Sequence, residues 1–386
     1  MSTLEARVRS RLAQWKAAGL LRVLRSPAGL DFCSNDYLHL AAHPYIVERF
    51  AAAARREGCG STGSRLLRGE REVFSAVEQR MADFKEAERA LYFSSGYLAN
   101  IAVMTAMAEQ GDVIFSDERN HASLIDGMRL SAATRVVFPH NDVTALGRLL
   151  ADTPVGSQGH RFVVVESLFS MDGDVAPLGQ YAALCRAAGA SLVVDEAHAV
   201  GVCGARGSGL VEAFGIASDV MMSINTAGKA LGASGAFVCG PEWAIDHLRQ
   251  HARPFVFSTA APPAVAAAID ASLDLLAEEP WRRTELAVRV QFVRDRLNAA
   301  GIGVAPSGSQ IVPIAIGDNE LAVVVARALQ AEGFDVRAIR PPTVPKGTAR
   351  LRLSINVGLS EAVLERFALS LGAALREVGL CSAASS

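Results

Sequence analysis

An acidic motif and a lysine follow two neighbouring apolar runs of the sequence and offer groups that could do covalent chemistry. The motif DEAH (195–198) comes directly after the run SLVV, which places Asp195 and His198 at the end of a predicted buried strand. Lys229 follows the next such run, VMMSI, and lies in the small-residue stretch NTAGKALG. Because ligands gather at the carboxyl ends of the strands of a parallel sheet, we expect these three side chains to face one crevice.

A carboxylate, an imidazole and an amine at neighbouring strand ends are the set of groups that pyridoxal phosphate requires. The amine forms a Schiff base with the cofactor aldehyde, and the carboxylate keeps the pyridine nitrogen protonated. Each residue has a structural explanation when it is taken alone: Asp195 could cap a helix, His198 could be a core histidine, and Lys229 could be solvated. Their joint placement favours a cofactor site.

Two glycine-rich segments do not support a nucleotide site. GCGSTG (58–63) matches the dinucleotide pattern, but the preceding residues, VERFAAAARREG, indicate a helix, whereas a dinucleotide site needs its glycines between a strand and a helix. GVCGARGSG (201–209) contains no Walker pattern. A nicotinamide, flavin or nucleotide phosphate site is therefore not expected.

The elements that must position these groups alternate between helix and strand. The segment EVFSAVEQRMADFKE places its apolar residues on one helical face. Short apolar runs, separated by helical stretches, indicate buried strands at 113–117, 135–138, 162–167, 191–198 and 220–224. This alternation predicts an α/β fold with a parallel sheet.

The chain is long enough for one large and one smaller domain. We expect a helical arm and the start of the small domain in residues 1–40, a large cofactor-binding α/β domain in 41–265, and a C-terminal α+β domain in 266–386. The sequence pattern changes after Gly240, where a proline-containing stretch, RPFVFSTAAPP, indicates a junction between domains. Strands near IVPIAI, FDVRAI and ARLRLSIN and two helical patterns follow it.

The composition argues against several classes of function. Half of the 386 residues are hydrophobic, and a net charge of -2 gives no electrostatic reason to expect nucleic acid or an anionic membrane surface as a partner. No uninterrupted apolar run reaches the roughly 18 residues that a membrane span needs. The six cysteines show no CxxC spacing, so neither a metal site nor a disulfide framework is indicated, and we expect a cytoplasmic protein.

Several motifs, in the same order along the chain, resemble those of the α-oxoamine synthases. They are SNDYL (34–38), GSRLL (63–67), SSGYLAN (94–100), NHASLIDG (120–127), FSMDGD (169–174), DEAHAVGVCG and TAGKALG, within a similarity that extends from about residue 22 to residue 376. The resemblance implies a pyridoxal-phosphate enzyme of the aminotransferase-like fold type I, with a large, mostly parallel-sheet domain and a smaller C-terminal α+β domain. It also implies a homodimer with shared active sites that joins an amino acid to an acyl thioester.

The resemblance assigns catalytic roles to four residues. Lys229 holds the cofactor and then removes the Cα proton of the amino acid. Asp195 pairs with the pyridine nitrogen and His198 hydrogen-bonds the phenolic oxygen, so that both tune the ring as an electron sink. His121 lies against the ring face and helps to orient the substrate.

Further residues are expected around the cofactor. Gly96 and Tyr97 lie at a predicted helix start, where backbone N–H groups bind phosphate, and Thr226 adds a hydroxyl. By resemblance, Glu166 and Ser170 line the same pocket.

Other residues are expected to bind the substrate or to complete the site across a dimer. Thr259 is expected to reach the cofactor phosphate of the partner subunit. Arg352 matches the arginine that binds the amino-acid carboxylate, with Asn35 nearby, and its structural alternative is a solvated strand arginine. Arg22 and Thr343 match positions near the acyl group or the product.

Within the family, IRPPTVPKGTARLRLS (339–354) and HNDV (140–143) are most similar to the member that condenses L-alanine with a pimeloyl thioester in biotin biosynthesis. Other members use glycine or serine with acetyl, succinyl or long-chain thioesters, and they stay open as alternatives. The acyl carrier stays open between coenzyme A and an acyl carrier protein. An aminotransferase of the same fold is a further alternative, and so is a non-catalytic partner subunit, although the retained Lys229, Asp195 and His198 argue against the latter.

One segment departs from the family pattern. After GSRLL the family commonly has serine, glycine and asparagine with a histidine following, whereas this chain has RGEREVF, with Arg68, Glu70 and Phe74. The departure concerns the preference for the acyl chain or amino acid and leaves the cofactor chemistry unaffected.

Overall fold

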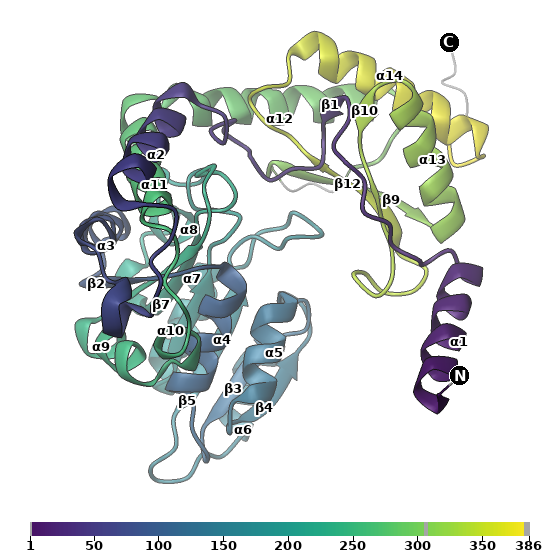
Figure 1. The fold of residues 1–386 in the computed structure, drawn as a ribbon. Coiled ribbons are helices and arrows are strands. Elements are labelled where there is room, and N and C mark those ends of the chain that lie inside the picture. Colours follow the sequence, from purple (N-terminus) through teal and green to yellow (C-terminus); the bar gives the residue numbers. More distant parts are fainter. Residues whose placement is uncertain (1, 305–307, 382–386) are drawn as a thin grey trace. The chain divides into compact units, whose positions relative to one another are not determined.

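The structure, a computed structural model, describes residues 2–304 and 308–381 and divides the chain into two compact units (Figure 1). The larger unit consists of Asn35–Ser170 and Asp174–Thr284, and the smaller unit consists of Met1–Ser34, Met171–Gly173 and Glu285–Ser386. These boundaries differ from the predicted ones, which lie after residues 40 and 265.

Helix α11 (Pro263–Glu278) explains the difference. The proline-containing stretch predicts a junction before this helix, but the helix packs against α2 (Pro44–Glu57) and α3 (Glu72–Lys85) of the larger unit. Asp270 of α11 forms an ion pair with Arg49 of α2, with 2.8 Å between Asp270 Oδ2 and Arg49 Nη2. The helix therefore belongs to the larger unit in spite of the prolines before it.

A seven-stranded sheet in the order β2-β8-β7-β6-β5-β3-β4 forms the centre of the larger unit. Strand β8 is antiparallel to both of its neighbours, whereas the other neighbouring pairs are parallel, so the prediction of a mostly parallel sheet is confirmed. The predicted apolar runs form β3 to β7, and the sequence analysis did not indicate β2 and β8. The strands are β2 (Arg89–Phe93), β3 (Val113–Asp117), β4 (Thr134–Phe138), β5 (Arg161–Glu166), β6 (Ser191–Asp195), β7 (Val220–Thr226) and β8 (Ala236–Gly240).

Helices cover this sheet. Helix α4 contacts β2, β7 and β8 and packs against α5 and α9, and buried side chains such as Leu91, Val103 and Ile224 form the core there. Besides α2, α3 and α11, the helices are α4 (Gly96–Met107), α5 (Ala122–Leu130), α6 (Val143–Asp152), α7 (Leu178–Ala188), α8 (Leu210–Ala213), α9 (Glu242–His251), α10 (Arg253–Val256) and α12 (Trp281–Ala299), which continues into the smaller unit. A π-helical turn (Arg65–Gly69) and a 3-10 turn (Ala217–Asp219) complete the list.

Polar residues gather where the central strands end. Glu166 is the last residue of β5 and pairs in register with Asp195, the last residue of β6, which in turn pairs with Ile224 of β7. Because the carboxyl ends of parallel strands meet at one edge of the sheet, the segments after β6 and β7 also start at this edge. GCGSTG follows helix α2, which confirms that it lacks the strand before it that a dinucleotide site needs.

The smaller unit is an α+β module, as predicted. It contains an antiparallel sheet in the order β11-β12-β9 and a parallel pair of β1 and β10, so the predicted strand FDVRAI is divided between two sheets. The stacked rings of Phe32 and Phe367, with centroids 4.1 Å apart, form part of its core. The elements are α1 (Thr3–Ala17), β1 (Leu30–Asp31), β9 (Ile311–Gly317), α13 (Asn319–Ala331), β10 (Phe334–Asp335), β11 (Ala338–Ile339), β12 (Ala349–Ser354) and α14 (Glu361–Glu377).

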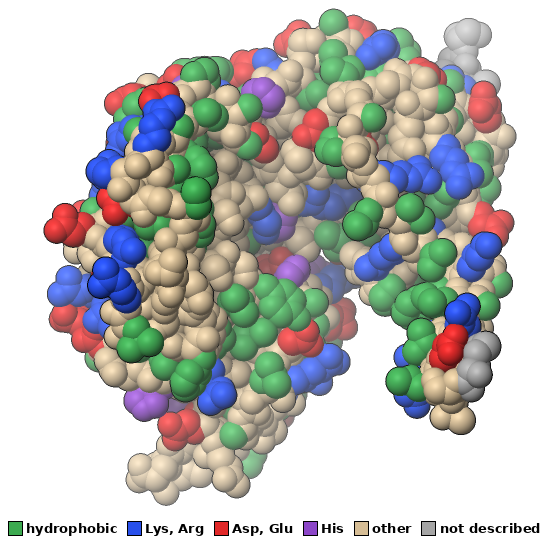
Figure 2. Space-filling model, in the orientation of Figure 1, with side chains coloured by type: hydrophobic (Ala, Val, Ile, Leu, Met, Phe, Trp, Pro, Cys, Tyr) green, Lys and Arg blue, Asp and Glu red, His purple; other side chains and the backbone are tan. Residues whose placement is uncertain are grey.

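Basic side chains are frequent on the face of the smaller unit that Figure 2 shows. Lys16, Arg25, Arg327 and Arg340 line a pocket of about 540 Å³ in this unit, and Glu320 adds a carboxylate. An anionic ligand would meet a favourable potential there. In the described part of the chain, no helix has the length and apolar character needed to cross a membrane.

Candidate active site

A pocket of about 300 Å³ opens at the carboxyl edge of the sheet in the larger unit. It is lined by most of the residues that the sequence predicts for the cofactor: Gly96, Tyr97, His121, Glu166, Asp195, His198, Thr226 and Lys229. These residues come from the ends of four strands and from the start of α4, so the fold brings together groups that are up to 133 positions apart in the sequence (96 to 229). The crevice expected from DEAH and Lys229 is therefore present.

Lys229 lies in the loop after β7 and contacts the imidazole of His198. Its Nζ is 2.9 Å from His198 Nε2, and His198 is 5% exposed. The other ring nitrogen, Nδ1, is 2.7 Å from the hydroxyl of Tyr37, which donates to Asn35 Oδ1 at 3.0 Å. Asn35 is thus connected to the pocket through the side chains of Tyr37 and His198, and Tyr37 is a residue of SNDYL to which the sequence analysis gave no role.

Asp195 is the starting point of a second chain of hydrogen bonds. The carboxylate is 4% exposed and accepts from the Ala197 N–H at 2.9 Å and from Asn100 Nδ2 at 2.7 Å. Asn100 also donates to Ser123 Oγ at 2.8 Å, and that oxygen is 2.7 Å from His121 Nδ1. The sequence analysis missed Asn100 and Ser123, although the motifs SSGYLAN and NHASLIDG contain them.

The protein environment shifts the pKa values of two ionisable groups of the pocket toward their neutral forms. Desolvation, reinforced by the Lys229 charge and opposed by Asp195, lowers the pKa of His121, although the residue is exposed. Complete burial, reinforced by the negative charge of Asp195, raises the pKa of Glu166 well above its usual range. The surroundings therefore oppose a charge on both of these neighbours of Asp195.

The start of α4 forms a close-fitting cradle. Ser95 caps the helix by accepting from the Leu98 N–H at 3.3 Å. A Cβ added to Gly96 would lie 2.6 Å from Thr226 Cγ2, so a side chain is excluded at this point. Since the N-terminus of a helix attracts anions, Gly96, Tyr97 and the hydroxyl of Thr226 offer groups that could bind a phosphate, and their assignment stays a prediction.

The donor set fits pyridoxal phosphate. The pocket combines an amine for the aldehyde, a buried carboxylate for the ring nitrogen and a helix start for the phosphate. Two buried acceptors, Asn100 Oδ1 and Glu166 Oε1, accept no hydrogen bond within the described residues, which is the pattern of a site that completes its contacts with a ligand.

Two predicted residues of the larger unit lie outside this pocket lining. Ser170 is half-buried, and a hydrogen bond from its backbone acts on the Glu166 carboxyl. Thr259 is exposed and lines a different, smaller recess that includes Arg65 and Phe255. Their assignments stay predictions.

The predicted substrate residues Arg22, Thr343 and Arg352 belong to the smaller unit. Arg22 Nη2 donates to Thr343 Oγ1 at 2.9 Å, so the structure pairs two residues that the sequence analysis placed near the acyl group. Arg352 is 7% exposed and donates to Ser354 Oγ at 2.7 Å, which argues against the alternative of a solvated strand arginine.

The departing segment RGEREVF has a structural explanation. Glu70 forms an ion pair with Arg65, and Arg65 also pairs with Glu78 at 2.5 Å. The buried ring of Phe74 lies under the Arg65 guanidinium, with 4.8 Å between the guanidinium carbon and the ring centroid. Arg68 is exposed. None of these residues lines the pocket of Lys229 in the described part of the chain.

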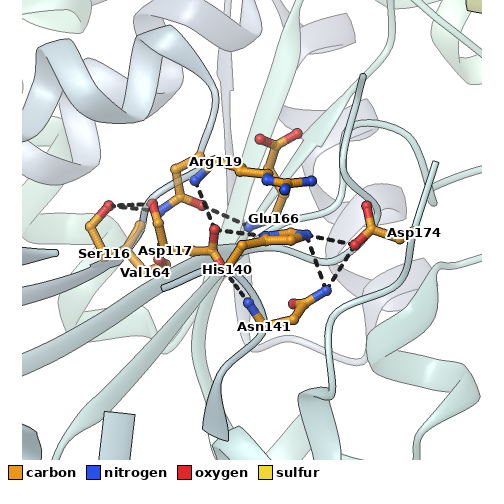
Figure 3. A network of polar contacts seen from close by, with 9 residues as sticks. Ser116, Asp117, Arg119, His140, Asn141, Val164, Glu166 and Asp174 are labelled. Atoms are coloured by element: carbon orange, nitrogen blue, oxygen red, sulfur yellow. Dashed lines mark hydrogen bonds and ion pairs between the residues drawn. The ribbon is translucent and has the colours of Figure 1, made fainter. Parts of the chain in front are cut away.

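A separate network surrounds His140 of the HNDV motif (Figure 3). Its Nδ1 is 2.9 Å from Asp117 at the end of β3, and its Nε2 is 2.6 Å from Asp174. Asn141 donates to both carboxylates, from its backbone N–H at 2.9 Å and from its side chain at 2.9 Å. Burial opposes a charge on His140, but the two carboxylates outweigh it and raise its pKa to about 9. The network ties the end of β3 to the loop that follows β5.

Comparisons with known proteins identify the family of the chain. Residues 27–371 match the family of class I and II aminotransferases. The 8-amino-7-oxononanoate synthase of Burkholderia thailandensis is 48% identical over 350 residues, 89% of this chain and 88% of that protein. The enzyme of the same name from Geobacter sulfurreducens is 43% identical over 384 residues, 96% and 98% of the two chains.

A solved structure shows the same fold. The serine palmitoyltransferase of S. paucimobilis, with a bound PLP-myriocin aldimine, has a TM-score of 0.91 and 28% identity and covers 99% of this chain and 100% of its own. These similarities confirm the resemblance seen in the motifs and the fold type I architecture. The chain therefore belongs to the class I and II aminotransferase family, and its curated relatives in that family are 8-amino-7-oxononanoate synthases.

Proposed function

We propose that the protein is a pyridoxal-phosphate-dependent C-acyltransferase that condenses L-alanine with a pimeloyl thioester, with loss of carbon dioxide, to give 8-amino-7-oxononanoate for biotin biosynthesis. The observation that carries the proposal is the meeting of Lys229, His198 and Asp195 in one pocket beside the Gly96 cradle. Two relatives that are 43% and 48% identical to this chain are named for this activity, and they match 96% and 89% of the chain.

The cofactor supplies an electron sink for the negative charge that develops at Cα of the amino acid. Asp195 supports this sink because a buried carboxylate keeps the ring nitrogen protonated. Asn100 holds the Asp195 carboxylate in place, and Ser123 extends the same chain to His121. The imidazole of His121, kept neutral by its surroundings, orients the substrate without adding a competing positive charge.

Lys229 handles the proton. As a neutral amine it takes the proton from Cα of alanine, and its contact with His198 holds Nζ at one place in the pocket. The same environment raises the pKa of the Glu166 carboxyl, which opposes a second negative charge near Asp195. Lys229 is therefore the base that the proposal assigns to the Cα proton.

The residues proposed to bind the substrate belong to the smaller unit. Arg352 is proposed to bind the alanine carboxylate, because a buried guanidinium on a strand gives a fixed, charge-assisted contact. Arg22, paired with Thr343, is proposed to receive the distal carboxylate of the pimeloyl chain. The cationic pocket around Arg327 and Arg340 suits an anionic acyl carrier, either coenzyme A or an acyl carrier protein.

A homodimer with shared active sites is part of the proposal, with Thr259 reaching the partner's cofactor phosphate. Exposed apolar side chains near Thr259 support an interface there: Phe257 is 71% exposed and Leu67 is 84% exposed. A cytoplasmic location is part of the proposal, and the free thiols of the six cysteines suit a reducing compartment.

A substrate screen tests the proposal. Alanine, glycine and serine are each combined with pimeloyl, acetyl, succinyl and long-chain thioesters, and released thiol and ketone product are measured. The expected result is the largest kcat/KM for alanine with a pimeloyl thioester. A larger value for another pair would assign the protein to a different α-oxoamine synthase, and amino-group transfer without thiol release would make it an aminotransferase. No activity with any pair would favour a non-catalytic partner subunit.

A further inference from the structure

Tyr37 and Lys229 each contact one of the two ring nitrogens of His198. Tyr37 is fully buried, and its oxygen lies 2.7 Å from His198 Nδ1 and 3.0 Å from Asn35 Oδ1. On the opposite side of the ring, His198 Nε2 lies 2.9 Å from Lys229 Nζ. The order of contacts is therefore Asn35, Tyr37, His198, Lys229.

The backbone fixes this arrangement. The Asp36 carboxylate accepts from the N–H groups of Leu40 at 2.8 Å and Ala41 at 3.0 Å, which closes the turn that carries Tyr37. Gly232, three residues after Lys229, approaches this turn so closely that a Cβ would lie 2.5 Å from the Ala41 nitrogen. The turn that carries Tyr37 and the loop that carries Lys229 are thus packed backbone against backbone, which holds the two residues on opposite sides of the His198 ring.

The contacts determine where the protons lie when Lys229 is an ammonium. An ammonium only donates, so His198 Nε2 must present its lone pair, and a neutral imidazole then carries its proton on Nδ1. That N–H needs an acceptor, which the Tyr37 oxygen provides. The single phenol proton goes to Asn35 Oδ1, so one arrangement satisfies these three contacts.

We propose that Tyr37 is a positioning residue that keeps the proton of His198 on Nδ1, so that the bare Nε2 accepts a proton from the Lys229 ammonium. In this step one N–H bond of Nζ breaks, an Nε2–H bond forms, and the positive charge moves to the imidazole ring. The Nδ1–H bond to the Tyr37 oxygen is retained. Lys229 becomes the neutral amine that bonds to an aldehyde. The inference rests on the proposed function in one respect, the role of Lys229 as the amine that holds the cofactor.

Nitrogen-15 NMR of the cofactor-free protein tests the proton position, with the His198 signals identified from their loss in His198→Gln. In the wild type, His198 is expected to be the Nδ1–H tautomer. In Tyr37→Phe that N–H loses its hydrogen bond to the Tyr37 oxygen, and the tautomer ratio should shift toward Nε2–H by about tenfold or more. A wild-type proton on Nε2, or an unchanged ratio in the variant, overturns the proposal.

Two further variants separate the tautomer effect from a packing effect. Asn35→Ala keeps the phenol of Tyr37 but removes the acceptor of its proton. The hydroxyl should then donate to His198 Nδ1, and the tautomer ratio should again shift toward Nε2–H. If Tyr37→Phe does not fold, the result for Asn35→Ala tests the proposal. Tyr181→Phe is the matched control, because Tyr181 is also fully buried and its oxygen has no hydrogen-bond partner within the described residues. The His198 spectrum of this control should be unchanged, and a shift there would overturn the specific role of Tyr37.

The rate at which the cofactor-free protein bonds to pyridoxal phosphate at neutral pH measures the consequence. This rate, followed by absorbance, should fall about tenfold in Tyr37→Phe and in Asn35→Ala and stay unchanged in Tyr181→Phe. A shifted tautomer with an unchanged rate would overturn the role of Nε2 as proton acceptor. Neither measurement involves turnover, so both outcomes are independent of the substrate assignment. Failure to bond to the cofactor in the wild type would instead count against the proposed function.

Discussion

Two histidines follow neighbouring strands of the same sheet, and their pKa values shift in opposite directions. Desolvation and Lys229, opposed by Asp195, lower the pKa of His121, which follows β3. At His140, which follows β4, burial also opposes charge, but hydrogen bonds to two carboxylates raise the pKa to about 9. One imidazole is neutral where it faces a pocket, and the other is charged where it joins Asp117 to Asp174.

The opposite pKa shifts of His121 and His140 distinguish two kinds of polar cluster, one suited to reaction and one that stabilises the fold. Around Lys229, the Asp195 carboxylate accepts from an amide and a backbone N–H, and the buried acceptors Asn100 Oδ1 and Glu166 Oε1 have no partner in the described chain. Around His140 and Arg65, positive and negative charges face each other directly. Removing a group from the first kind of cluster should therefore impair chemistry, and removing one from the second kind should impair stability.

Replacement of Lys229 gives the largest expected effect. Lys229→Ala should abolish turnover, because cofactor attachment and proton removal both need the amine. Borohydride treatment of the yellow wild-type protein should fix a pyridoxyl group on Lys229, as peptide mapping can show. Lys85 provides the contrast, since its buried Nζ is paired with Glu196 at 2.5 Å and should carry no label. A label elsewhere, or a colourless protein after reconstitution, would contradict the cofactor assignment.

Replacement of Asp195 should give the second largest loss of activity. Asp195→Ala should lower kcat by at least about a hundredfold, because a pyridine nitrogen without an anionic partner loses its proton and the ring accepts electrons poorly. Asp117→Asn removes a buried carboxylate from the His140 cluster instead and should lower the unfolding temperature with kcat little changed. Activity of Asp195→Ala within a few-fold of the wild type, measured at saturating cofactor, would refute the role of Asp195.

The sequence predicts those parts of the site whose residue types are distinctive. Lys229, Asp195 and His198 follow apolar runs that are recognisable as strands, and their joint occurrence already indicates the cofactor. Asn100, Ser123 and Tyr37 could not be assigned in this way, because an amide or a hydroxyl is common in any motif and acquires its role only from the group opposite it.

The fold was predictable to a similar extent. Uninterrupted apolar runs indicate the parallel strands, since both faces of such strands are buried. The edge strand β2 and the antiparallel β8 carry no such clear signal in the sequence analysis. The domain boundary was misplaced because prolines before α11 signal a break in local structure, whereas the packing of α11 on α2 depends on residues more than two hundred positions away.

The charge of His140 should make stability depend on pH. Because its folded pKa of about 9 lies above the ordinary histidine value of about 6.5, its stabilisation is fully present below pH 6.5 and is lost as the pH rises through 9. The loss in unfolding free energy is at most about 3 kcal/mol and smaller after solvent screening. His140→Asn should remove this dependence in urea unfolding between pH 6 and pH 10. His247→Asn is the control, since His247 hydrogen-bonds a backbone carbonyl, and equal pH profiles for both variants would contradict the prediction.

The smallest expected effect concerns the segment that departs from the family pattern. Glu70 is 42% exposed in its ion pair with Arg65, so Glu70→Asn, which restores the family residue, should lower the unfolding free energy by less than about 1 kcal/mol. Arg65 keeps its pair with Glu78, which is 10% exposed and also accepts the Tyr92 N–H at 2.8 Å, so Glu78→Gln should cost more. Because neither carboxylate lines the Lys229 pocket, the order of kcat/KM among acyl thioesters should be the same in Glu70→Asn as in the wild type. A changed order would show that this charged cluster takes part in substrate choice, and the division between reactive and structural clusters would then fail at this segment.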